Sequence, residues 1–270
     1  MKILALTRAP QFSPNSVERD KAIIEAVAKQ LQTAGCETVM MSEEEYVNSD
    51  VTLRYNFAGT LVMARLPEAL RKLCRQGLPA INSPQALLTF SRSHINTRMA
   101  ELQAPMPPAE GPDGYWIKRG DACAQTKGDV VFCKDTEALA RAKRLFATRG
   151  ITDYVVSAHV QGDLVKFYGV HGTPFFSCSY PTDGGHSKFG DESHNGQAMH
   201  YAFSRQSLHH WADTISAATA IDIYGGDAIV RADGSFCIID FNDWPSFSSC
   251  REEAAKAIAG LALRKLHTTQ

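Results

Sequence analysis

The segment from residue 225 to residue 242 constrains the fold more than any other part of the chain. Two apolar runs flank an Asp-Gly pair at 233–234, which is a strong short-range signal for a β-hairpin. Asp240 and Asn242 share one face of the second strand, because side chains alternate along a strand. We expect Asp227, on the first strand, to lie almost opposite Asn242 and to share that face. Two carboxylates and an amide oxygen together predict a Mg²⁺ site completed by phosphate oxygens.

The alternative for this hairpin is a turn with solvated carboxylates, which is common for aspartate. Asp240, however, directly follows the apolar run Phe236-Cys237-Ile238-Ile239. A carboxylate in such surroundings is costly unless a positive group faces it. The context therefore favours a cation beside Asp240.

Composition limits the partners that the chain can have. The 270 residues are 44% hydrophobic and 21% charged, with a formal net charge of −1. This balance gives no basic surface for nucleic acid or an anionic membrane, so we expect small-molecule substrates instead. The chain has 7 cysteines and no C-x-x-C pair, which argues against a disulfide framework or a zinc site. No signal-peptide pattern or membrane-spanning run is seen, so we expect a cytoplasmic protein.

The N-terminal part predicts a small Rossmann-like lobe. An apolar strand at 2–7 is followed by a helix that starts near Ser16 and a second strand at 37–41. This strand–helix–strand order is typical of a parallel sheet. A third strand near 51–53, a helix at 67–76 and a short strand at 78–81 would complete the lobe. No G-x-G-x-x-G follows the first strand, so a dinucleotide is not expected there.

The rest of the chain has a different pattern. A proline-rich stretch at 103–112 is the best linker candidate. After it we expect strands at 115–118, 130–133 and 154–156, a helix at 135–149, a hairpin at 164–177, a glycine-rich stretch at 182–197, a helix at 208–220 and a last helix at 252–266.

Lys118 ends a predicted strand and precedes a loop of small residues at 120–128. The backbone N–H groups of such a loop can approach phosphate oxygens. A lysine at a strand end is more often an exposed ion-pair former, and the P-loop pattern G-x-x-x-x-G-K-[ST] is absent. The loop alone leaves both interpretations open.

The order of elements and the metal signature together resemble the ATP-grasp superfamily, in particular the carboxylate–amine/thiol ligases related to D-alanine–D-alanine ligase and glutathione synthetase. That signature is an acid, twelve residues, an acid, one residue and an asparagine, then a proline. Asp227, Asp240, Asn242 and Pro245 match it. The resemblance implies an α/β fold, α+β in the ATP-binding part. A Rossmann-like lobe (1–82) would precede a two-lobed ATP-grasp domain (83–160 and 161–270).

The resemblance also implies ATP and Mg²⁺ as cofactors, with Mn²⁺ as a substitute, and it assigns residues to the phosphates. Lys118 would bind the α- and β-phosphates, and Lys127 and Gly128 would belong to the loop that covers them. Lys166 and Lys188 would be the catalytic lysines, near the substrate and the γ-phosphate. A loop that closes over phosphate excludes water and prevents wasteful hydrolysis.

For the nucleoside, the resemblance places the adenine-reading hinge at Ser157, Ala158 and Val160. Asp163 would hold the ribose hydroxyls. The family often has a glutamate at the hinge, where Ser157 and Ala158 stand here. The contacts with the nucleoside can therefore differ in this chain.

One phosphate-binding position departs from the family pattern. A lysine is usual in the helix that enters the central lobe, and here Arg92, His94 and Arg98 surround that place. The sequence does not decide which of the three replaces it.

The predicted function is an ATP- and Mg²⁺-dependent ligase that activates a small-molecule carboxylate as an acyl phosphate for attack by an amine or a thiol. Substrate candidates are Arg8 and Asn15 after the first strand, Arg54 after the third, and Ser246 and Arg251 beside the metal strand. Each arginine has the alternative of a surface ion pair. A small-molecule kinase and a non-catalytic ATP-binding module are the other functions considered. The family also implies that a homodimer is to be expected.

Overall fold

The computed structural model describes residues 1–13, 16–50, 56–121, 126–183 and 194–267. Its strands form three sheets, and the predicted α/β class is confirmed. The N-terminal sheet has the order β2-β1-β3-β4 and is parallel throughout. Its strands are β1 (Lys2–Thr7), β2 (Glu37–Ser42), β3 (Gly59–Val62) and β4 (Ala80–Ile81), with helix α1 (Val17–Thr33) between the first two.

The strand β3 was not predicted from the sequence. The stretch 51–53 lies outside the described residues, and β3 occupies Gly59–Val62, which is buried at every position. This segment has no alternation and spans only four residues, and periodicity alone does not distinguish such a strand from a buried helix segment. Helix α2 (Glu43–Asn48) lies between β2 and β3, and α4 (Pro67–Gln76) follows β3 at the predicted position.

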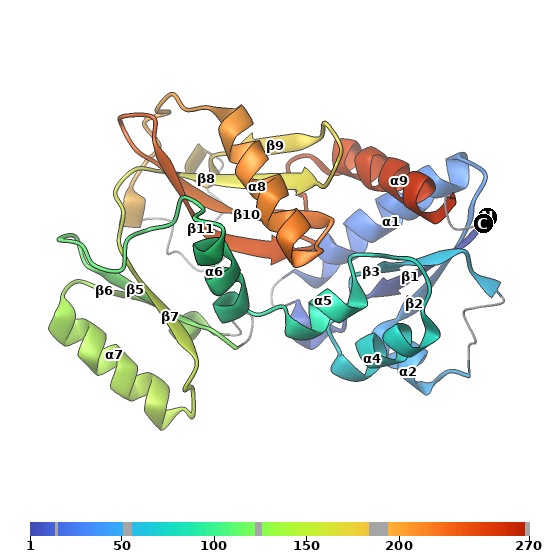
Figure 1. Cartoon of the computed structure of the whole chain (residues 1–270), viewed down its shortest axis with the longest axis horizontal. Coiled ribbons are helices and arrows are strands. Elements are labelled where there is room, and N and C mark those ends of the chain that lie inside the picture. Colours follow the sequence, from blue (N-terminus) through green and yellow to red (C-terminus); the bar gives the residue numbers. More distant parts are fainter. Residues whose placement is uncertain (14–15, 51–55, 122–125, 184–193, 268–270) are drawn as a thin grey trace.

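The central sheet is antiparallel, with the order β6-β5-β7. It consists of β5 (Tyr115–Arg119), β6 (Val130–Cys133) and β7 (Tyr154–Ala158), and helix α7 (Thr136–Thr148) covers one side. Its small core is separate from the other cores and is built around Ile117 and Phe146. In Figure 1 this sheet and α7 form one end of the molecule.

The C-terminal sheet has the order β11-β10-β8-β9 and is antiparallel. Its strands are β8 (Asp163–Val170), β9 (Phe176–Ser179), β10 (Ile223–Val230) and β11 (Phe236–Asp243), with helix α8 (Arg205–Thr219) against the sheet. Two helices, α5 (Pro84–Thr89) and α6 (Arg92–Glu101), precede the central sheet. Short 3-10 turns lie at Pro10–Phe12 (η1), Lys127–Asp129 (η2) and Pro181–Asp183 (η3).

The last helix, α9 (Arg251–His267), packs back against α1 (Figure 1). One buried cluster joins Ile23 and Val27 of α1 with Ile258 of α9, and it also contains Trp244 and Phe247 from the loop before α9. The start and the end of the chain therefore share a core. No helix in the described part of the chain is both long and apolar enough to cross a membrane.

Glu43, at the start of α2, anchors the two loops that carry Arg8 and Arg65. Its fully buried carboxylate accepts hydrogen bonds from the backbone N–H groups of Ala9 (2.6 Å), Arg65 (2.6 Å) and Leu66. Hydrogen bonds to a charged group are stronger than neutral ones, and an unpaired buried donor is costly.

We expect Glu43→Gln to lower the free energy of unfolding by about 2–4 kcal/mol, because the amide would turn an N–H₂ group toward backbone donors. Urea denaturation followed by circular dichroism measures the change. Glu44→Gln, one residue along on the exposed side of the same helix, is the matched control and should change stability by less than about 0.5 kcal/mol. Equal effects of the two variants would contradict the anchoring role.

Candidate active site

A cavity of about 990 Å³ lies between the three sheets. Its lining includes residues from β5, β7, β8, β10, β11 and α6, together with the loops that follow β1 and β3. The cavity therefore has three chemically different regions. They are an oxygen-rich face on β10 and β11, an apolar end near the connection between β7 and β8, and a charged end on the N-terminal lobe.

The oxygen-rich face carries the predicted metal ligands. Asp227 pairs directly with Asp240 across the hairpin, and Asn242 pairs with Gly225. The expectation that Asp227 lies opposite Asn242 is thus wrong by two positions, because the connection and a β-bulge after Asp227 set the register. The shared face is unaffected, since Asp240 and Asn242 are two residues apart, and all three line the cavity.

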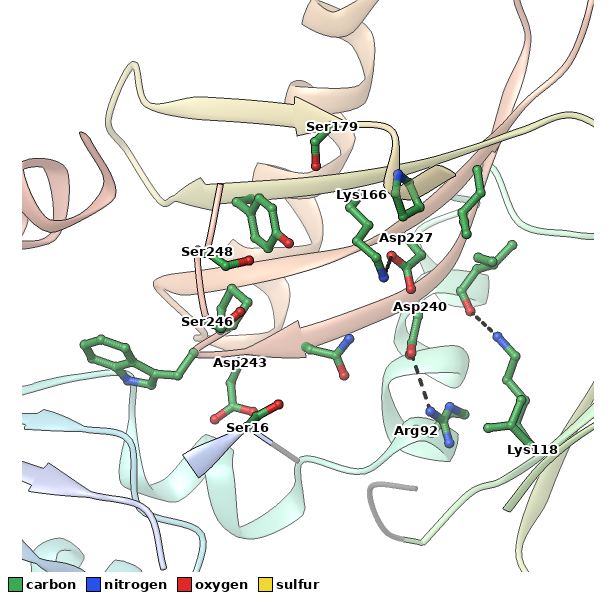
Figure 2. Close-up of a pocket in the computed structure, with 18 of the residues that line it drawn as sticks. Ser16, Arg92, Lys118, Lys166, Ser179, Asp227, Asp240, Asp243, Ser246 and Ser248 are labelled. Atoms are coloured by element: carbon green, nitrogen blue, oxygen red, sulfur yellow. Dashed lines mark hydrogen bonds and ion pairs between the residues drawn. The ribbon is translucent and has the colours of Figure 1, made fainter. Parts of the chain in front are cut away.

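Positive side chains surround these carboxylates (Figure 2). The Lys166 Nζ lies 3.2 Å from Asp227 Oδ1, and an Arg92 guanidinium nitrogen lies 3.5 Å from Asp240 Oδ2. Burial raises the pKa of Asp240, but Arg92 and Lys118 outweigh it, so the pKa of this carboxyl lies below its ordinary value. Asn242 adds a side-chain hydrogen bond to Asp240. The Asp240 carboxylate is therefore kept ionised.

The donor set fits Mg²⁺. Two carboxylates and one amide oxygen are hard ligands, and they leave several positions for water and phosphate oxygens. In the described part of the chain, no group of three His, Cys, Asp or Glu side chains is placed to hold a metal by itself. Asp227, Asp240 and Asn242 would hold the ion, and water and phosphate oxygens would fill its remaining positions.

Lys118 reaches the same face from β5. Its Nζ donates to the backbone carbonyl of Ile239 at 3.0 Å (Figure 2). Burial lowers the pKa of Lys118, and Asp240 partly opposes this. A partly desolvated ammonium beside a cavity is well placed to meet phosphate oxygens.

The structure distinguishes among the three basic residues of α6. Arg92 lines the cavity and donates to the backbone carbonyl of Arg119 at 2.6 Å. His94 is exposed, and Arg98 pairs with Glu101 on the outer face of the helix. Arg92 is therefore the basic residue from this helix that faces the carboxylates.

The apolar end of the cavity contains the predicted hinge residues Ser157, Ala158 and Val160. These residues end β7 and enter the connection to β8. Other residues give this end a mostly apolar wall: Trp116, Val130, His159, Leu164, Ile229 and Ile239. A flat heterocycle fits such surroundings, because apolar walls favour its faces while polar groups at the rim read its edge.

Other predicted site residues do not line the cavity. Asp163 is buried, and its two carboxylate oxygens accept from the backbone N–H groups of Met199 (2.7 Å) and Tyr201 (2.8 Å). It points away because its neighbour Leu164 takes the cavity face of β8. The ribose contact predicted for Asp163 is therefore not supported by its placement.

Lys127 and Gly128 form part of η2, where the Gly128 carbonyl accepts from Arg149 at 2.7 Å, and neither lines the cavity. Arg251 begins α9 and is also absent from the lining. Asn15, Arg54 and Lys188 lie outside the described residues.

The charged end of the cavity holds Arg8 and Ser246, two of the candidates for substrate contacts, and also residues that the sequence did not single out. Arg8 lies 3.0 Å from one carboxylate oxygen of Asp243, and Arg65 pairs with the other. Arg8 also lies 3.5 Å from Asp20. The two ion pairs of Asp243 join the N-terminal lobe to the residue that follows the predicted metal ligand Asn242.

Arg65 was missed because β3 was not placed correctly, although a charged residue just after a buried strand is a recognisable signal. Hydroxyl groups also line the cavity, and they come from Ser13, Ser16, Tyr168, Ser179, Tyr180, Ser246, Ser248 and Ser249. Burial raises the pKa of Tyr168 to about 12, so its phenol stays protonated at neutral pH.

Comparison with solved structures identifies the architecture. A RimK domain protein of the ATP-grasp type from Sphaerobacter thermophilus superposes with a TM-score of 0.64 at 14% identity, covering 97% of this chain and 99% of that chain. The D-alanyl-alanine synthetase A from Vibrio cholerae gives a TM-score of 0.68 at 11% identity, with 99% and 98% covered.

The chain has the ATP-grasp fold. A further ATP-grasp structure, the ligase PsnB in complex with a minimal precursor, gives a TM-score of 0.62 at 11% identity and covers 97% of this chain and 98% of that chain. No protein-family model and no curated protein sequence match this chain. The ATP-grasp resemblance drawn from Asp227, Asp240 and Asn242 is thus confirmed at the level of the fold.

Proposed function

We propose that the protein is an ATP- and Mg²⁺-dependent ligase that activates a small-molecule carboxylate for attack by an amine or a thiol. One observation carries the proposal. A single cavity connects an apolar slot for the base, a cationic and oxygen-rich face for the phosphates and Mg²⁺, and a polar end on the N-terminal lobe. The ligases among the solved structures with the same fold support this interpretation.

The proposed reaction has two steps. A carboxylate oxygen of the substrate attacks the γ-phosphorus of ATP, the bond from that phosphorus to the bridging oxygen breaks, and ADP leaves. The nitrogen or sulfur nucleophile then attacks the acyl carbon, the C–O bond to phosphate breaks, and the nucleophile loses its proton. Bound Mg²⁺ would neutralise charge on the phosphates.

The residues of this chain would stabilise and position the reacting groups. Lys118 and Arg92 lie beside the Asp240 carboxylate and can contact phosphate oxygens once the ion is bound. Lys166, which pairs with Asp227, lies on the same sheet as the metal ligands and would face the phosphoryl group in transfer. Ser246 and Tyr168 would orient the substrate at the polar end.

A metabolite screen that measures ADP and inorganic phosphate together tests this function. A ligase should release both only when a carboxylate and an amine or thiol are present, and hydroxylamine should trap the acyl phosphate as a hydroxamate. ADP formation with a single hydroxyl compound and no phosphate release would instead indicate a kinase. Binding of MgATP without turnover in any mixture would indicate a binding module and contradict the proposal.

A further inference from the structure

Four rings form a cluster at the apolar end of the cavity, which we call the hinge ring cluster: Trp116, Phe132, His159 and His194. The Trp116 and Phe132 centroids are 5.3 Å apart, and the Phe132 ring lies 5.4 Å from His159 and 4.5 Å from His194. Trp116 and His159 line the cavity. A polar ring is thus held among aromatic neighbours where the base of a nucleotide would lie.

The tautomer of His159 follows from its contact with Trp116. The indole Nε1–H of Trp116 lies 3.0 Å from Nδ1 of His159. An indole nitrogen can only donate, so Nδ1 must accept and the ring proton must be on Nε2. Burial lowers the pKa of His159, with a partly opposing contribution from Asp113. The imidazole is therefore neutral at pH 7 and carries its single N–H at Nε2.

Several backbone groups of the hinge are already paired before any ligand binds. The N–H groups of Ala158 and His159 both donate at 2.8 Å, to the carbonyls of Pro108 and Gly114. The side-chain amide of Asn195 donates to the carbonyls of Val160 (2.9 Å) and Gly162 (3.1 Å). These hydrogen bonds leave fewer main-chain groups to read a base, which increases the importance of polar side chains in the lining.

We propose that His159 reads the nucleotide base, with its Nε2–H donating a hydrogen bond to a ring nitrogen of adenine. Trp116 is a positioning residue that fixes the tautomer. The inference rests on the proposed function, because it assumes that the nucleotide binds in this cavity. His159 is only 9% exposed. A buried donor discriminates well between bases, because a base without an acceptor at that place leaves the donor unpaired.

Isothermal titration calorimetry with MgATP and its 1-deaza, 3-deaza and 7-deaza analogues tests the proposal. Each analogue replaces one ring nitrogen with C–H. We expect the wild type to bind one of the three about 3–10-fold more weakly than ATP. His159→Phe should bind ATP weakly and should no longer prefer ATP to that analogue. His159→Gln, whose amide can donate from a similar place, should restore part of the preference for ATP. Thermal melting of each variant shows whether it is folded.

Trp116→Phe provides a readout that does not depend on nucleotide binding. Nitrogen-15 NMR should show His159 protonated at Nε2 in the wild type and a mixture of tautomers in this variant. An unchanged preference among the analogues in His159→Phe, or an Nδ1–H tautomer in the wild type, would overturn the inference. Failure of the wild type to bind any nucleotide would instead overturn the proposed function, so the two failures are distinguishable.

Discussion

Asp240→Asn is expected to reduce ATP-dependent ADP formation by about 10²–10³-fold, which corresponds to about 3–4 kcal/mol of lost transition-state stabilisation. Asp240 would be a ligand of Mg²⁺, and it faces both Arg92 and Lys118. Its amide replacement keeps the shape but removes the charge that holds the ion. The measurement is ADP release under the conditions that give turnover in the wild type, together with MgATP affinity by calorimetry.

Asp233→Asn is the matched control for this variant. Asp233 lies in the turn of the same hairpin, is exposed and bonds locally to Ser235 at 2.9 Å. Asp233→Asn should leave ADP formation within about twofold of wild type, because Asp233 is not among the residues that line the cavity. A fully active Asp240→Asn enzyme would refute the assignment of the metal face.

Asp243→Asn is expected to lower the free energy of unfolding by about 3 kcal/mol or more. The Asp243 side chain is 1% exposed and pairs with Arg8 and Arg65, whose side chains are each 10% exposed. When one partner of a buried ion pair is removed, the remaining charges are buried without compensation. This destabilises the fold by much more than the intact pair stabilises it. Chemical denaturation by urea, fitted to a two-state transition, measures the change.

The control for this variant is Glu37→Gln. Glu37 pairs with Lys2 at 2.8 Å, and their side chains are 63% and 39% exposed, so loss of this pair should cost less than about 1 kcal/mol. A double-mutant cycle of Asp243→Asn with Arg65→Met should give a coupling energy of about 1 kcal/mol or more. A coupling energy near zero would show that this ion pair does not hold the lobes together.

The parts of the fold that the sequence predicted well are those whose local signals agree with their tertiary surroundings. The β1–α1–β2 unit and the helix at Pro67–Gln76 have clear periodicity, and the β10–β11 hairpin has an unambiguous turn. β3 was not predicted, because a short buried strand in a parallel sheet has neither alternation nor a flanking turn to mark it. Its four residues form a strand only because β1 and β4 pair with them.

The candidate site was predicted best where chemistry and spacing coincide. Asp240 and Asn242 share one face because side chains alternate along a strand, and Asp227 stays on that face because its register differs from the expected one by an even number of residues. Asp163 shows the limit of this reasoning, because which face a strand turns to a cavity depends on the tertiary packing. The local sequence could not show that the backbone N–H groups of residues 199 and 201 would donate hydrogen bonds to the Asp163 carboxylate.

The packing of α9 against α1 divides the molecule into a larger body and a smaller one. The N-terminal and C-terminal sheets are locked into one body by the shared core around Ile23, Val27 and Ile258 and by the Asp243 ion pairs. The β6-β5-β7 sheet keeps a separate small core with α7. We therefore expect this sheet and α7 to move as one unit against the larger body, and such a movement would change the width of the cavity that they line together.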